Sequence, residues 1–239
     1  MQKWKLFICV SFCVIGLIGI LITDVQPLVT ANSAAEIPAA TKYLALTFDD
    51  GPKAGTTDRL LDGLKERGAN ATFFLVGECA AVNQGLVRRM RDEGHQVGNH
   101  TWSHVRLEGA DPDVLLQEIQ HNETLLQEIL GGEHYWLRPP YGVIDSELEG
   151  LVTVPMIKWS VDPKDWESRN RETIVTTVLR EVKPGSIILM HDIYPDSVDA
   201  ALELVDRLQQ EGYWFVTVEE LFLLHGIEAE NGVMYRTGA

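Results

Sequence analysis

Five short clusters of polar residues could do chemistry, and nearly every one stands at the end of a run of apolar or β-branched residues. The clusters are TFDDGP (47–52), HTWSH (100–104), RPPYG (138–142), DPKDW (162–166) and LMHD (189–192). Their carboxylates and imidazoles are groups that transfer protons and bind divalent metal ions. Because the carboxyl ends of parallel strands in a barrel open on one face, we expect these clusters to meet in one site.

The first cluster places two carboxylates side by side. Asp49 and Asp50 end an alternating apolar segment and are followed by Gly51 and Pro52. A turn at the end of a strand can direct both acids into one site, where one binds a cation and the other stays free to accept a proton. A plain Asp-Gly turn with two solvated acids is the alternative interpretation.

The second cluster contains two imidazoles. His100 and His104 are four residues apart, which predicts that both lie on one side of a helical turn. Together with a carboxylate such as Asp50 they form a three-ligand set that leaves a coordination position open, which is typical of a catalytic zinc site. Surface or capping histidines also occur at this spacing, and the same ligand types hold iron in non-haem oxygenases.

The remaining clusters contain an arginine and a third histidine. Pro139 and Pro140 stiffen the loop that follows Arg138, so its guanidinium could be held against a catalytic carboxylate and the Tyr141 N–H aimed at an oxyanion. His191 ends a buried apolar run and has a pKa suited to protonating a leaving amine. An arginine paired with any surface acid and a hydrogen-bonded core histidine are the alternatives.

The segments that position these clusters alternate between two patterns. β-Rich runs occupy residues 43–48, 71–77, 96–99, 135–138, 156–161, 186–190 and 214–218. Apolar residues at helical spacing occupy residues 57–67, 86–93, 114–130, 174–182 and 198–210. This alternation predicts an α/β fold, a distorted (β/α) barrel of about seven parallel strands in a single domain.

The amino-terminal segment predicts export. Lys3 and Lys5 precede an apolar run from Leu6 to Ile22, and a segment rich in Ala, Thr, Pro and Ser follows. We expect a signal peptide or membrane anchor at 1–22, a linker at 23–41 and a catalytic domain at 42–239. Whether the segment is cleaved stays open, and in either case the domain lies outside the cytoplasm.

Composition limits the partners. A formal net charge of −15 argues against binding of nucleic acid, because such binding depends on neutralising phosphates with basic side chains. Cys79 is the one cysteine outside the apolar run, so no disulfide within the exported part can form. It is either a small, partly buried residue or a nucleophile. We expect a monomer.

The order and content of all five clusters resemble the polysaccharide deacetylase family, also called carbohydrate esterase family four, from about Tyr43 to Leu224. The chain is most similar in this respect to peptidoglycan N-acetylglucosamine deacetylases. The resemblance implies that Asp49 is the catalytic base and His191 the catalytic acid. It also implies a divalent metal, zinc first, with cobalt or another divalent ion as alternatives.

The resemblance assigns roles to the other site residues as well. It implies that Asp50, His100 and His104 bind the metal. It implies that Arg138 tunes the catalytic base and that Asp165 pairs with the catalytic acid. Substrate contacts would come from Tyr141, through its backbone N–H, and from Trp166 and Leu189, as walls of an acetyl-methyl pocket.

By this likeness the function would be removal of N-acetyl groups from an amino-sugar polysaccharide, with the N-acetylglucosamine of peptidoglycan as the leading substrate. Chitin oligosaccharides, N-acetylmuramic acid and acetylated xylan are alternatives, because the motifs do not separate them. A non-catalytic protein that binds envelope polysaccharide is an alternative of another class. An iron oxygenase is disfavoured, since its ligands usually lie on an antiparallel scaffold.

Overall fold

The computed structural model describes residues 42–109, 111–132 and 134–239. The predictions for segments 1–22 and 23–41 therefore lie outside the described residues. Among the helices of the described ranges, none combines the length and the apolar character that crossing a bilayer requires.

A parallel sheet is built around the first strand. β1 (Lys42–Asp49) pairs with β2 (Thr72–Leu75), β5 (Ile187–His191) and β6 (Tyr213–Phe215), and β3 (Gln96–Asn99) extends the sheet beyond β2. All four pairings are parallel. Every residue of β1 after the first is buried, as expected for a strand that is covered on both faces.

Shorter pairings continue the barrel between β3 and β5. β4 (Met156–Ile157) pairs in parallel with β7 (Met234–Tyr235), and Leu137 forms single-residue bridges to Asn99 and Met156. A further bridge joins residues 161 and 188. The arrangement is an α/β fold consistent with the predicted distorted barrel. The predicted strand at 135–138 is wrong beyond the bridge at residue 137, because the two prolines that follow lack the N–H donors a strand needs.

The predicted helices are present with small changes at their ends. They are α1 (Thr57–Glu66), α3 (Gln84–Asp92), α4 (Pro112–Leu130), α7 (Arg171–Glu181) and α8 (Pro195–Gln210). Short elements that the periodicity did not predict are α2 (Gly77–Val82), α5 (Ser146–Glu149), α6 (Asp165–Ser168), α9 (Val218–Leu224) and a 3₁₀ turn at Pro140–Gly142. The Asp111 side chain caps α4 by accepting a hydrogen bond from the Asp113 N–H.

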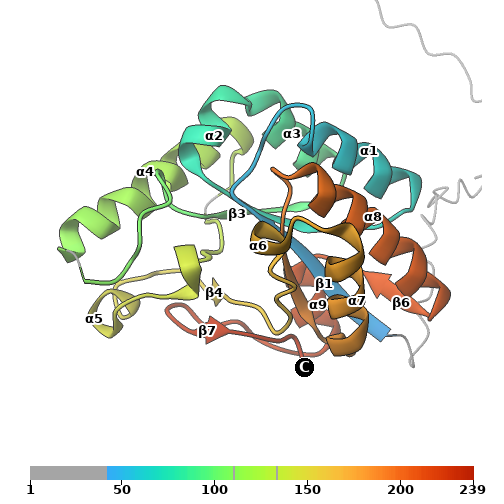
Figure 1. The fold of residues 1–239 in the computed structure, drawn as a ribbon. Helices are drawn as coiled ribbons and strands as arrows, with labels where there is room; N and C mark the ends of the chain where they lie inside the picture. The colour runs from blue at the N-terminus through green and yellow to red at the C-terminus, as the bar shows by residue number, and fades with distance from the viewer. Residues whose placement is uncertain (1–41, 110, 133) are drawn as a thin grey trace, which may run out of the picture. The chain divides into compact units, whose positions relative to one another are not determined.

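The helices flank the strands and bury the core against them. In Figure 1, α1, α3 and α8 lie along one side of the sheet, with α7 beside α8. Phe48 and Phe73 stack at 5.2 Å between ring centroids within the largest apolar cluster. In the register of β1 and β5, Asp49 lies directly opposite His191. The packing of the strands therefore places two of the predicted chemical groups side by side.

Candidate active site

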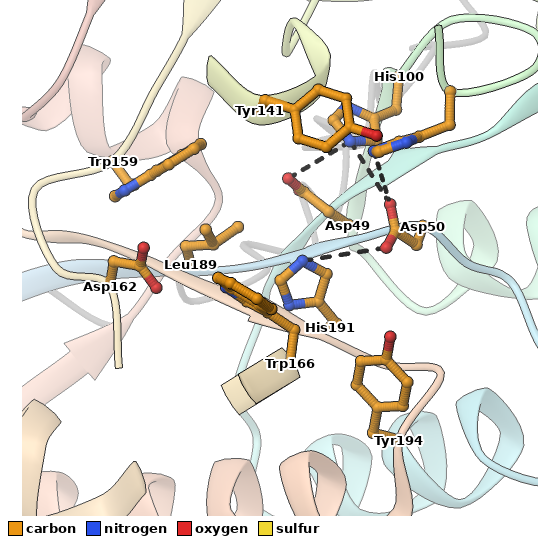
Figure 2. Close-up of a pocket in the computed structure, with 11 residues that line it drawn as sticks. Asp49, Asp50, His100, Tyr141, Trp159, Asp162, Trp166, Leu189, His191 and Tyr194 are labelled. Carbon is orange, nitrogen blue, oxygen red and sulfur yellow. Dashed lines mark ion pairs between the residues drawn. The ribbon is translucent and has the colours of Figure 1, made fainter. Parts of the chain in front are cut away.

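The carboxyl ends of the strands surround a cavity of about 360 Å³. Figure 2 shows its lining side chains pointing toward one another from separate elements. They are Asp49, Asp50, His100, His104, Tyr141, Trp159, Asp162, Trp166, Leu189, His191 and Tyr194. All five clusters therefore contribute residues to the lining.

One side of the cavity holds three groups that could bind a metal ion. Asp50, His100 and His104 each offer one ligand atom, and these atoms lie within 4.8 Å of one another. The Asp50 Oδ1 atom is 3.3 Å from His104 Nε2 and 3.6 Å from His100 Nε2. That oxygen is buried and has no hydrogen-bond partner among the described residues. A buried oxygen without a hydrogen bond, next to two imidazole nitrogens, fits a divalent cation of the zinc type.

The His100 ring is held in the form that a ligand requires. Its Nδ1 is 2.6 Å from the Arg138 carbonyl oxygen, so Nδ1–H donates to that oxygen and Nε2 keeps its lone pair toward Asp50. Burial lowers the pKa of His100, although the charges of Asp49 and Asp50 oppose this effect. The imidazole is therefore neutral near pH 7, as metal binding demands.

The segment that carries both histidines is a loop, so the prediction of a helical turn is wrong. Thr101 and His104 adopt left-handed backbone angles, with φ of 65° and 59°. The Asn99 side chain accepts a hydrogen bond from the Thr101 N–H at 2.8 Å, and Asn122 donates to the Thr101 carbonyl oxygen at 3.0 Å. These buried hydrogen bonds offset a backbone strain of about 1–3 kcal/mol per residue. The same hydrogen bonds hold the loop in a conformation that directs the His100 and His104 side chains into one site.

The second carboxylate, Asp49, is fixed by a buried arginine. Arg138 donates from Nη1 to Asp49 Oδ1 and to Thr47 Oγ1, each at 2.7 Å. Burial lowers the pKa of Arg138, and the charge of Asp49 opposes that shift, so the guanidinium stays charged. The other oxygen of Asp49 lies 3.6 Å from His100 Nε2, at the edge of the candidate metal site. One oxygen of Asp49 is thus held and the other faces the cavity.

On the opposite side of the cavity, His191 is paired with a buried acid. Asp165, at the start of α6, accepts from the His191 backbone N–H and lies 2.8 Å from Nδ1 of its ring. Burial alone would lower the pKa of His191, but the hydrogen bond and charge of Asp165, together with the charges of Asp49 and Asp50, raise it to about 9. The ring is therefore protonated at neutral pH, with Nε2 directed toward the cavity, 4.0 Å from Asp50 Oδ2.

The predicted substrate contacts also line the cavity. The Tyr141 side chain is 57% exposed and packs edge-on to the His104 ring, while Trp166 is 48% exposed and Leu189 is buried. Three lining residues had no predicted role: Trp159, Asp162 and Tyr194. Asp162 stands in the DPKDW cluster, so its motif was a signal, whereas Trp159 and Tyr194 flank motifs without belonging to them.

Sequence reasoning also missed the role of Asp192. Its fully buried carboxylate accepts a hydrogen bond from the Thr57 hydroxyl, which itself accepts from the Lys53 N–H at 2.8 Å. A Cβ atom added at Gly51 would lie 2.3 Å from an Asp192 oxygen, so a side chain at position 51 would clash. Burial raises the pKa of Asp192 to about 7, although the Thr57 hydrogen bond opposes this. The network ties the end of β5 to the turn that follows Asp50.

Known proteins resemble this chain in sequence and in fold. The family model for polysaccharide deacetylase matches residues 36–153. A family 4 acetyl xylan esterase from Clostridium thermocellum, solved in complex with a cobalt ion, superposes with a TM-score of 0.77 at 32% identity, over 82% of this chain and 98% of that one. This chain belongs to the polysaccharide deacetylase family.

Two curated deacetylases are similar over most of the chain. The peptidoglycan-N-acetylmuramic acid deacetylase PdaC of Bacillus subtilis is 42% identical over 75% of this chain. The peptidoglycan-N-acetylglucosamine deacetylase PgdA of Listeria monocytogenes is 38% identical over 78% of it. The chain spans 38% and 41% of the length of these two relatives.

The pairing of His191 with Asp165 predicts a measurable titration in the metal-free protein. In Asp165→Asn the pKa of His191 should fall well below 9, because burial still opposes the charged ring while its main partner is lost. NMR titration of the histidine ring protons measures this. Glu167→Gln, an exposed acid in the same short helix, is the control and should leave the titration unchanged. An unchanged His191 pKa in Asp165→Asn would refute the assignment.

Proposed function

We propose that this protein is a metal-dependent hydrolase that removes N-acetyl groups from an amino-sugar polysaccharide, with the N-acetylglucosamine of peptidoglycan as the leading substrate. The observation that carries the proposal is the three-ligand set of Asp50, His100 and His104 beside an acid that is free on one side and a protonated histidine on the other. The names of the similar proteins support the same chemistry.

Asp50, His100 and His104 would hold the ion, and zinc suits one carboxylate oxygen with two imidazole nitrogens. The cobalt ion in the similar acetyl xylan esterase supports a divalent metal without fixing which one. When bound, such an ion polarises a carbonyl oxygen and lowers the pKa of a water molecule.

The residues of the chain supply the proton transfers. The cavity-facing oxygen of Asp49 is placed to take a proton from the attacking water, while Arg138 holds the other oxygen. His191 is placed to give its Nε2 proton to the departing sugar nitrogen, with Asp165 holding the ring. One group is placed to accept a proton and the other to give one, which hydrolysis of an amide requires.

Other lining residues would position the acetyl group. Trp166 and Leu189 supply apolar walls for its methyl group, and the backbone N–H of Tyr141 would support the negative charge that develops on the carbonyl oxygen. The alternative of a non-catalytic polysaccharide-binding protein does not account for a fully buried Arg138 beside an acid in the cavity, since burying that pair is costly and binding does not need it.

N-Acetylmuramic acid, chitin oligosaccharides and acetylated xylan remain alternative substrates. The names of PdaC and of the acetyl xylan esterase favour two of them. We further propose that residues 42–239 are the catalytic domain, that residues 1–22 direct export or anchor the chain, and that residues 23–41 link the two. The enzyme would then act outside the cytoplasm, as a monomer.

Acetate release from peptidoglycan fragments tests the proposed reaction. We expect a chelator to abolish release and zinc or cobalt to restore it. Asp49→Asn should lose at least about 10²-fold in kcat because its proton acceptor is gone, and His104→Ala should lose both activity and metal binding.

Asp62→Asn, which alters an exposed acid on α1, is the control and should behave as the unaltered protein. Near-normal turnover by Asp49→Asn would contradict the proposal, as would activity that persists after the metal has been removed. Mass spectrometry of the digested fragments identifies which sugar has lost its acetyl group.

Cell fractionation tests the proposed location. In a Gram-positive host we expect the full chain in the membrane fraction or, if the apolar segment is cleaved, in the medium, because the run from Leu6 to Ile22 directs export. External protease should then digest the anchored protein on intact protoplasts. Recovery of the chain in the cytosol, protected from protease, would rule out the proposed location.

A further inference from the structure

Two cationic side chains stand next to each other at the rim of the active-site face. In the parallel pairing of β4 and β7, Ile157 lies opposite Tyr235, and the next residues along the two strands are Lys158 and Arg236. The Lys158 N–H donates to the Tyr235 carbonyl oxygen at 2.7 Å, which keeps the register to the end of the pair. Figure 1 shows β4 and β7 side by side. Both cations therefore follow the carboxyl ends of parallel strands, as the active-site residues do.

Lys158 and Arg236 line a second cavity of about 330 Å³, here called the rim pocket. Neither forms an ion pair with any residue that the structure describes. Two acids also line the pocket. Glu108 forms an ion pair with Arg106 at 2.8 Å, and Glu149 lies beyond ion-pair distance of Lys158 and Arg236. Burial, followed by the charge of Arg236, lowers the pKa of Lys158. Two like charges thus line one pocket, and neither is neutralised by an ion pair with a described residue.

The rim pocket shares a wall with the active-site cavity. Tyr141 and Trp159 line the active-site cavity, whereas their chain neighbours Gly142 and Lys158 line the rim pocket. A Cβ atom at Gly142 would lie 2.7 Å from both the Lys158 stem and the Trp159 ring, so these segments are in close contact. A polymer that crosses the active-site cavity would therefore reach the rim pocket with a neighbouring unit.

We propose that Lys158 and Arg236 bind a carboxylate carried by the glycan near the sugar that is deacetylated. This inference rests on the proposed function and narrows its substrate class to an anionic amino-sugar polymer. Chitin is neutral, whereas peptidoglycan carries carboxylates on the lactyl group or the peptide of every second sugar. Two adjacent cations match the two oxygens of a carboxylate, and an anion between them removes their mutual repulsion. The chain has a net charge of −15, so most of its surface repels an anionic glycan. The two cations provide a local region that attracts it.

The test compares substrates with and without carboxylates. Lys158→Met/Arg236→Gln keeps the apolar stem of Lys158 against Gly142 while removing both charges. KM is measured for three substrates: chitohexaose, glycan strands stripped of peptide, and muropeptide chains with their stems. We expect the ratio of KM for stripped strands to KM for chitohexaose to rise about tenfold in the variant, as the loss of two ion-pair contacts near the surface implies. Arg236→Lys, which keeps the charge, should retain most of the preference.

A matched control removes two other exposed cations. Lys183→Met/Arg88→Gln makes the same change in net charge; Lys183 precedes β5, at the opposite end of that strand from His191, and Arg88 lies on α3. This control should leave the KM ratio unchanged. About 0.5 M salt should lower the preference of the unaltered protein for stripped strands, because exposed charges are screened. A raised ratio for muropeptides alone would place the carboxylate on the stem peptide, and a raised ratio for stripped strands would place it on the lactyl group.

Equal changes of KM for neutral and anionic substrates, or no change for either, would overturn the inference while leaving the proposed reaction intact. If the unaltered protein releases no acetate from any of the three glycans, the proposed function fails instead. Calorimetry can then still test the inference. It measures the binding of stripped strands and of muropeptides to Asp49→Asn, with and without the rim-pocket substitutions. Loss of that binding supports the rim-pocket site, and equal binding by both forms refutes it.

Discussion

The buried ion pair between Arg138 and Asp49 is the contact on which the rest of the site depends. The Arg138 guanidinium donates hydrogen bonds to Asp49 and Thr47 at the end of β1. It also donates to the carbonyl oxygen of Lys158, just after β4. The Arg138 carbonyl oxygen accepts the hydrogen bond that fixes the His100 ring. Removing one partner of such a buried pair typically costs about 3–5 kcal/mol, because the other charge is left unpaired. One residue therefore links the predicted base, a predicted metal ligand and the sheet that carries them.

The balance between burial and neighbouring charges separates the roles of chemically similar groups in this small space. Asp49 keeps one oxygen free because Arg138 holds the other, whereas Asp165 has both oxygens bonded to His191. His100 is neutral because burial dominates its surroundings, and His191 is charged because Asp165 outweighs burial. These surroundings suit His100 to bind a metal, Asp49 to accept a proton and His191 to donate one, all within one cavity and before substrate binds.

The sequence predicted which residues meet because motif chemistry and strand alternation are local signals. TFDDGP, HTWSH and LMHD stand at the carboxyl ends of β1, β3 and β5, and parallel pairing brings those ends together. Other features depend on tertiary contacts that no spacing reveals. The loop that carries His104 is shaped by Asn99 and by Asn122 on α4, and β7 is too short to leave a periodic pattern. The role of Asp192 follows from its distance to Gly51, a residue far away along the chain.

The central claim is that Asp50, His100 and His104 bind one divalent cation while Asp49 stays unligated beside it. A crystal structure of the zinc-loaded protein, with anomalous scattering measured on both sides of the zinc absorption edge, tests it most directly. We predict one strong anomalous peak in contact with an Asp50 oxygen and with Nε2 of both histidines, at about 2.0–2.2 Å. An ion bound through Asp49 in place of Asp50, or no peak among these three residues, would contradict the account.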